Sequence, residues 1–155
     1  MRRDLFSRRL IVHDAYTYDY AIVRVVPKVE REEFINVGAI VSCAAREFLG
    51  CRIELDVPRL LALDSSVDVD FVRSHLATIS AICAGGEEAG PIGRLSQGER
   101  FRWLVVPRST VIQTSSSHVG RCQDPEKELE HLVERMVRAE QSDPRPVARP
   151  MHRDR

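Results

Sequence analysis

The stretch of the sequence with the most varied chemistry is a polar run over residues 107–118, PRSTVIQTSSSH. It holds an arginine, several hydroxyls, a side-chain amide and an imidazole. An arginine beside hydroxyls could bind an anion, and an imidazole could act as a general base towards a hydroxyl. The side chains that would form such a site are Arg108, Ser109, Gln113 and His118.

Two side chains from an earlier block could complete this cluster. One is Glu32 or Glu33, at the end of a charged segment, and the other is Asn36, near the start of the strand-like run FINVGAIV that follows. No second half of a catalytic triad is visible, and serine and threonine clusters commonly satisfy backbone groups at strand ends. The polar run therefore allows two interpretations, an anion-binding or catalytic site and a structural strand end.

Other residues of reactive type favour structural roles. The four cysteines form no CxxC pair and have no histidine at metal-ligand spacing, so we expect no metal, no cofactor and reduced thiols. A redox pair between Cys43 and Cys51 is the alternative to the commoner use of buried thiols as small apolar fillers. The glycine-rich residues 85–93 could approach a phosphate, but they lack the lysine and the strand-to-helix context of a phosphate-binding loop.

Strands are predicted in the first half of the chain. The β-branched runs 21–26 and 35–41 indicate two strands, and the first is apolar on both faces, as an interior strand would be. In the second run, strict alternation puts Asn36 and Gly38 on one face, and a glycine inside a strand indicates a bulge or a close backbone approach. Residues 48–55 alternate between apolar and polar, which predicts a half-buried third strand in a hairpin with the second.

Two helical segments are predicted next. A short helical turn over residues 58–63 precedes a longer helix over residues 68–84, whose apolar side chains recur every three or four residues. His75 lies beside this apolar stripe. The glycine-rich residues 85–93 then predict a flexible loop.

Two further helices are predicted in the second half. Ser96 and Glu99 fit a capping box, which favours a helix over residues 97–105, and a strand through residues 103–106 is the alternative. The clearest helical pattern in the chain begins after Asp124 and carries an apolar stripe up to residue 137.

These elements predict a single α+β domain over residues 16–140, with an antiparallel sheet of about four strands covered by two long amphipathic helices. Residues 1–15 are expected to be a flexible extension and residues 141–155 a disordered basic tail. Each end has four arginines against two aspartates, a formal charge of +2, which leaves −4 for the middle of a chain of zero net charge.

This charge distribution bears on the possible partners. A domain that binds nucleic acid through its folded surface needs a basic patch there, whereas the excess of arginine in this chain lies at its ends. No apolar run approaches the roughly 20 residues of a membrane span. We therefore expect a cytoplasmic protein that has no membrane segment and does not bind nucleic acid through its folded domain.

Three blocks of the sequence resemble one known family. YDYAIVRVVP and EREEFINVG near the start and FRWLVVPRSTVIQTS later in the chain are similar to a family of small bacterial proteins catalogued only as a domain of unknown function. Members of this family are often encoded beside a kinase that resembles the toxin-type serine kinases of persistence modules. The resemblance therefore implies a protein partner and supplies no catalytic residues.

Two hypotheses about function follow. The first is a small binding or regulatory partner, possibly of such a kinase, which rests on the resemblance and on the lack of a catalytic constellation. The second is an enzyme or anion-binding domain that uses Arg108, Ser109, Gln113 and His118, joined by Glu33 and Asn36.

Overall fold

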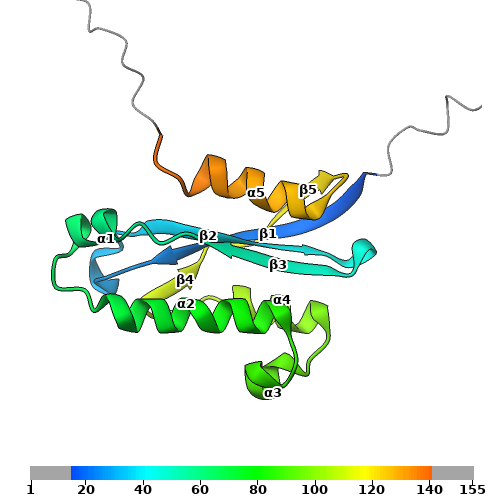
Figure 1. The fold of residues 1–155 in the computed structure, drawn as a ribbon, viewed down its shortest axis with the longest axis horizontal. Helices are drawn as coiled ribbons and strands as arrows, with labels where there is room; N and C mark the ends of the chain where they lie inside the picture. The colour runs from blue at the N-terminus through cyan, green and yellow to red at the C-terminus, as the bar shows by residue number, and fades with distance from the viewer. Residues whose placement is uncertain (1–14, 141–155) are drawn as a thin grey trace, which may run out of the picture.

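The computed structural model describes residues 15–140, and the predicted extension and tail lie outside the described residues apart from Ala15. The fold is α+β, with a five-stranded antiparallel sheet between two helical layers (Figure 1). The elements are β1 (Tyr16–Val25), β2 (Ile35–Cys43), β3 (Phe48–Ile53), α1 (Val57–Leu63), α2 (Val69–Ala84), α3 (Gly90–Gly93), α4 (Gln97–Val105), β4 (Ile112–Thr114), β5 (His118–Cys122) and α5 (Pro125–Met136). Within this part of the chain no helix is long and apolar enough to cross a membrane.

Strand β1 is the centre of the sheet. One edge of β1 pairs with β2, which in turn pairs with β3 in the predicted hairpin. The other edge is shared by two short strands, since β5 pairs with residues 16–20 and β4 with residues 23–25. The prediction of an interior first strand is confirmed. The sheet has five strands and not about four, because the polar run and the residues after it form two short strands, β4 and β5.

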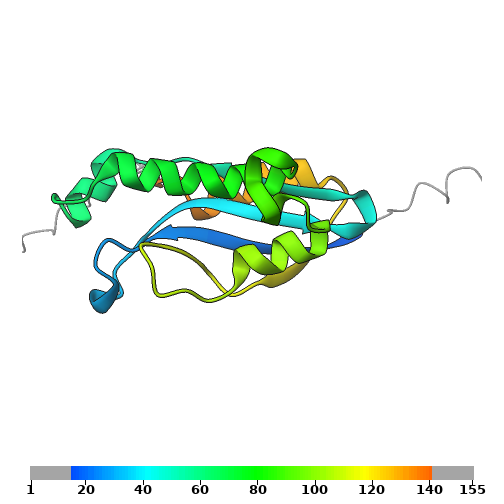
Figure 2. The same cartoon turned by 90° about the horizontal axis from the view of Figure 1, so that it is seen from below.

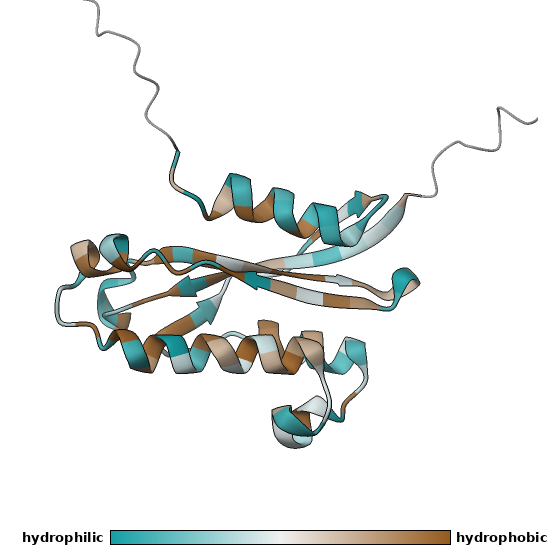
Figure 3. Ribbon diagram, viewed as in Figure 1, coloured by the Kyte–Doolittle hydropathy of each residue, from teal (hydrophilic) through white to brown (hydrophobic). Residues whose placement is uncertain are grey.

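The apolar residues of β1 alternate between two hydrophobic clusters, one on each face of the sheet. Tyr18 and Ile22 pack towards α5, whereas Val23 and Val25 pack towards α2 and α4. Figure 3 shows hydrophilic residues on the outer side of α5 and hydrophobic residues on the side that faces the sheet. Because a strand with both faces covered must be apolar on both faces, this arrangement explains the sequence of β1.

A bulge in β2 changes which residues share a face. Val23 of β1 pairs with Gly38, but the next residue, Arg24, pairs with Asn36, so Val37 is the extra residue. The amide Nδ2 of Asn36 donates to the carbonyl of Met136 in α5 at 3.0 Å, on the side opposite Ile40. The prediction that Asn36 and Gly38 lie on one face is therefore wrong, because strict alternation does not hold across a bulge.

The helices begin where their capping residues predict. Asp68 accepts a hydrogen bond from Phe71 N at the start of α2, and Asp124 accepts two at the start of α5. The capping box of Ser96 and Glu99 is present, and the helix it predicts is α4, so the alternative strand over residues 103–106 is wrong.

The glycine-rich segment after α2 departs from the prediction of a loop. It forms a 3₁₀ turn, Glu87–Ala89, followed by the single turn of α3. Gly86 N donates to the carbonyl of Gly93 at 2.9 Å and closes the segment on itself. A Cβ added at Gly93 would lie 2.1 Å from the carbonyl oxygen of Gly86, so this closure requires the glycine.

We expect Gly38→Val to lower the free energy of unfolding by about 1 to 3 kcal/mol, because the site has no room for a side chain. A Cβ at residue 38 would lie 2.6 Å from both the carbonyl oxygen of Arg52 and Cδ1 of Ile53. The measurement is equilibrium denaturation, and the control is Gly98→Ala in α4, where nothing lies within 4 Å of the added Cβ. The control should gain up to about 1 kcal/mol. Equal stability of Gly38→Val and the native protein would contradict the close approach.

Candidate functional site

A groove of about 550 Å³ lies between α2 and the segment that runs from α4 to β4. Figure 2 shows α2 along one face of the sheet, with α4 and its connection to β4 beside it. Cavities of roughly 300 to 1,000 Å³ are typical of ligand sites. The groove has an apolar lining, formed by Val29, Ile79, Ile82, Leu104, Val106, Val111 and Ile112.

One wall of the groove is a stripe of α2 residues that the sequence analysis did not recognise. Phe71, His75, Thr78 and Ile82 all line the groove and recur at helical spacing. The first three lie one residue out of step with Val72, Leu76 and Ile79 of the stripe that enters the core. Ile82 is itself buried in the core, and Ile79 also lines the groove. Adjacent residues in a helix point about 100° apart, so the two stripes cover adjacent sides of α2. The feature of the sequence that could have indicated this stripe is Phe71, a large aromatic residue that lies outside the core stripe.

The opposite rim carries an aromatic residue and a cation. The guanidinium of Arg108 stacks over the ring of Trp103, 4.2 Å from the ring centroid. Arg108 also donates to the carbonyl of Trp103 at 2.7 Å and to that of Leu104 at 3.3 Å. These carbonyls belong to the last turn of α4 and have no partner within the helix, so Arg108 caps its negative end. Arg108 therefore has a structural contact with α4.

His75 does not form a catalytic pair with the neighbouring serine. Its Nδ1 atom lies 2.9 Å from the carbonyl oxygen of Phe71 and 3.4 Å from the hydroxyl of Ser74. A carbonyl can only accept a hydrogen bond, so we assign the proton of the neutral imidazole to Nδ1. The hydroxyl of Ser74 donates to the same carbonyl at 2.9 Å. Nδ1 therefore has no lone pair with which to activate this hydroxyl.

Three other polar side chains of the groove, those of Thr78, Thr110 and Gln113, are bound to the backbone. Thr78 donates to the carbonyl of Ser74 at 3.3 Å, and Thr110 donates to that of Ile112 at 2.8 Å. The amide of Gln113 donates to the carbonyl of Thr110 at 2.9 Å. Of the described residues that line the groove, the charged or titratable ones are His75 and Arg108, and none is a carboxylate. The arrangement suits binding of an apolar group that carries a negative charge.

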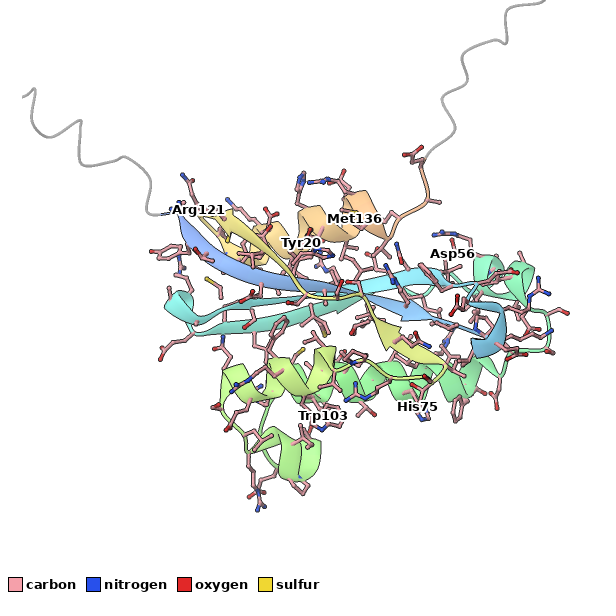
Figure 4. All side chains as sticks on the ribbon, turned by 180° about the vertical axis from the view of Figure 1, so that it is seen from behind. Tyr20, Asp56, His75, Trp103, Arg121 and Met136 are labelled. Atoms are coloured by element: carbon pink, nitrogen blue, oxygen red, sulfur yellow. The ribbon has the colours of Figure 1, made fainter. Side chains whose placement is uncertain are left out.

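The structure separates the six residues of the predicted cluster. Arg108, Ser109 and Gln113 line the groove. His118 lies in β5 opposite Tyr20, and the two rings are 5.3 Å apart. Figure 4 shows Tyr20 on the same side of the sheet as α5, whereas Trp103 and His75 lie on the other side. The imidazole and the guanidinium of the polar run therefore lie on opposite faces.

The two residues from the earlier block also lie away from the groove. Asn36 is bound to α5, and its Oδ1 atom is buried without a hydrogen-bond partner. Glu33 forms an exposed ion pair with Arg31 in the connection between β1 and β2. Glu32, the alternative to Glu33 in the predicted cluster, takes a left-handed backbone conformation that ends a 3₁₀ turn. Neither glutamate is among the residues that line the groove.

Ser115 gives one hydroxyl of the polar run a structural role. Between β4 and β5, its backbone N–H donates to the carbonyl of Ile22 at 2.8 Å, and its hydroxyl accepts from Ile22 N at 2.9 Å. The hydroxyl also donates to the carbonyl of Ser116 at 2.9 Å. A serine side chain thus takes the place of a backbone carbonyl at the break in the edge strand. Ser115 is one of two buried polar residues among those described.

Comparison with known proteins gives a family. The model of the family described as "Protein of unknown function (DUF3037)" matches residues 20–137. This match confirms the resemblance to a domain of unknown function that the three sequence blocks indicated. No curated protein and no solved structure matches the chain.

We expect Ser115→Ala to lower the free energy of unfolding by about 1 to 3 kcal/mol, because the buried N–H of Ile22 loses its acceptor. Thermal or chemical denaturation measures the change. Ser117→Ala is the matched control, since Ser117 is exposed in the same polar run. A loss of stability in both variants, or in neither, would contradict the specific role of Ser115.

Proposed function

We propose that this chain, which belongs to the family described as "Protein of unknown function (DUF3037)", is a non-catalytic binding protein that regulates a partner through the groove beside α2. The observation that carries the proposal is an apolar groove whose charged or titratable side chains are His75 and Arg108. Hydroxyls and amides that are bound to the backbone can shape a surface but do not provide a nucleophile and its base.

The proposed occupant is an apolar segment of a partner protein that carries one acidic residue. Phe71 and Trp103 are 47% and 38% exposed at the two sides of the groove, and large aromatic residues are common anchors of protein interfaces. A guanidinium has five N–H donors, and the cap of α4 engages Arg108 through two of its nitrogens. Donors therefore remain for a carboxylate, which would add a charge-assisted hydrogen bond.

The proposed partner is a toxin-type serine kinase encoded beside the gene, as the family resemblance implies. The proposed setting is the bacterial cytoplasm, where thiols stay reduced. The four cysteines of this chain are free, which agrees with such a compartment.

The alternative of a catalytic or anion-binding cluster has less support. Its imidazole and its arginine lie on opposite faces of the sheet, so His118 cannot act on a group held by Arg108 without refolding of the edge strand. We keep Arg108 in the proposal as a binding residue.

We expect Val106→Asp to weaken binding of the neighbouring kinase about tenfold or more, because a carboxylate at the rim must be desolvated beside an apolar partner. Val106 lines the groove and is 51% exposed, so its replacement should not disturb the core. The measurement is titration calorimetry with the purified kinase, preceded by thermal melting to show that the variant is folded.

The matched control is Val119→Asp. Val119 is 68% exposed in β5, outside the groove, and the same substitution there should leave the affinity unchanged. Equal affinities of the two variants, or no binding of the kinase by the native chain, would overturn the proposal.

A further inference from the structure

Two cysteines from distant parts of the sequence meet between β3 and α2. Cys51 lies in β3 and Cys83 in the last turn of α2, and Cys51 packs against the hydrophobic cluster that contains Cys83, which brings the two thiols within reach of a hydrogen bond. The thiol of Cys51 also lies 3.5 Å from the hydroxyl of Ser80, one turn before Cys83 in the same helix. Cys51 is partly exposed, whereas Cys83 is 5% exposed. The geometry therefore combines an accessible thiol with a buried one.

The surroundings give the two thiols different pKa values. The hydrogen bond from Cys83 lowers the pKa of Cys51 to about 7; burial opposes this shift, and the bond to Ser80 adds to it. The same bond to Cys51, together with burial, raises the pKa of Cys83. The guanidinium of Arg100, which donates to the carbonyls of Ile82 and Cys83, acts to lower the pKa of Cys83, but the bond to Cys51 and burial outweigh it. The proton of the pair therefore stays on Cys83, and Cys51 is the thiolate near neutral pH.

We propose that Cys51 is a site of oxidation by hydroperoxides, and that Cys83 resolves the product into a disulfide that joins β3 to α2. This modification is independent of the binding function proposed for the groove.

The reaction takes place in two steps. The Cys51 thiolate attacks one peroxide oxygen, the O–O bond breaks, and hydroxide leaves and takes up a proton to give water, which leaves a sulfenic acid on Cys51. The sulfur of Cys83 then attacks the sulfur of the sulfenic acid, the S–O bond breaks, and the proton of Cys83 leaves with the departing hydroxide as a second water. Two thiols and one hydrogen peroxide thus give one disulfide and two waters.

The other two cysteines cannot take either role. Cys43 and Cys122 belong to the hydrophobic cluster that faces α5, on the side of the sheet opposite Cys83. Burial is the main reason that the pKa of Cys122 is raised. The pair Cys43 and Cys51, which the sequence left open, is excluded because the two side chains point to opposite faces of the hairpin.

The experiment uses the full chain and hydrogen peroxide at one equivalent. We expect the intact mass to fall by two hydrogens, and peptide mapping without reduction to find residues 51 and 83 in one linked pair. Alkylation of Cys51 by iodoacetamide, followed from pH 5 to 10, should have its midpoint near pH 7. In urea the midpoint should move to about 8.5, the ordinary value of a free thiol.

Variants separate the two roles. Cys83→Ala should stop at a sulfenic acid on Cys51 that a 1,3-dione reagent traps, whereas Cys122→Ala, the matched control, should still form the link. If Cys83→Ala does not fold, the peptide map of the native chain decides alone. The proposal is overturned if peroxide oxidises the native chain without a link between residues 51 and 83, or if the alkylation midpoint is the same with and without urea.

Discussion

Strand β1 needs hydrogen-bond partners along both edges and apolar neighbours on both faces, because its second half lies buried in the middle of the sheet. Ala21, Val23 and Val25 are fully buried. A buried backbone group without a partner costs free energy comparable to a lost hydrogen bond, so both edges of β1 must be satisfied along their length. The hairpin of β2 and β3 provides the partners for one edge of β1. The partners for the other edge come from a segment about ninety residues later in the chain, which is too polar to be buried itself.

That constraint explains most of what the polar run does. The run covers β1 as two short strands with Ser115 at the junction, where its hydroxyl replaces a backbone acceptor. Two hydroxyls of the run, those of Thr110 and Ser115, are therefore structural. The same break puts the two ends of the run on opposite faces, with Arg108 beside α4 and His118 beside Tyr20. Arg108 and His118 are therefore close in the sequence but far from each other in the fold.

The helix ends show a second use of residues that resemble binding groups. An arginine donates to carbonyls at the C-terminal ends of three helices. Arg100 donates to Ile82 and Cys83 in α2, Arg108 to Trp103 and Leu104 in α4, and Arg59 to Val137, the residue that follows α5. Because these carbonyls have no partner within their helices and carry partial negative charge, a cation satisfies both needs. Arg138 forms ion pairs with Glu54, the residue after β3, and with Glu130 in α5, and so connects these two elements. The hydrogen bond from Arg138 is the main reason that the pKa of the Glu54 carboxyl is lowered. Much of the positive charge of the folded part therefore acts within the fold.

Local patterns predicted what depends on local physics. The first three strands, the helix after Asp68, the capping box at Ser96 and the helix after Asp124 all follow from periodicity and caps within one segment. The face of Asn36 could not be predicted, because the bulge at Val37 depends on pairing with β1. The pairing of β4 and β5 with β1, and the meeting of Cys51 with Cys83, are likewise decided by contacts between distant segments.

Helix α2 shows how both candidate sites arise from one element with three differently used sides. One side, Val72, Leu76, Ile79 and Cys83, fills the core; Phe71, His75 and Thr78, on the next side, line the groove together with Ile79; and the exposed Ser80, one turn before Cys83, meets Cys51 of β3. An amphipathic helix needs only about a third of its circumference to attach to a sheet. The two sides adjacent to the core stripe are left at the margin between interior and solvent, where side chains are positioned by packing yet stay accessible. That margin is where an exposed aromatic residue and a partly exposed thiol can be held in fixed geometry without opening the core.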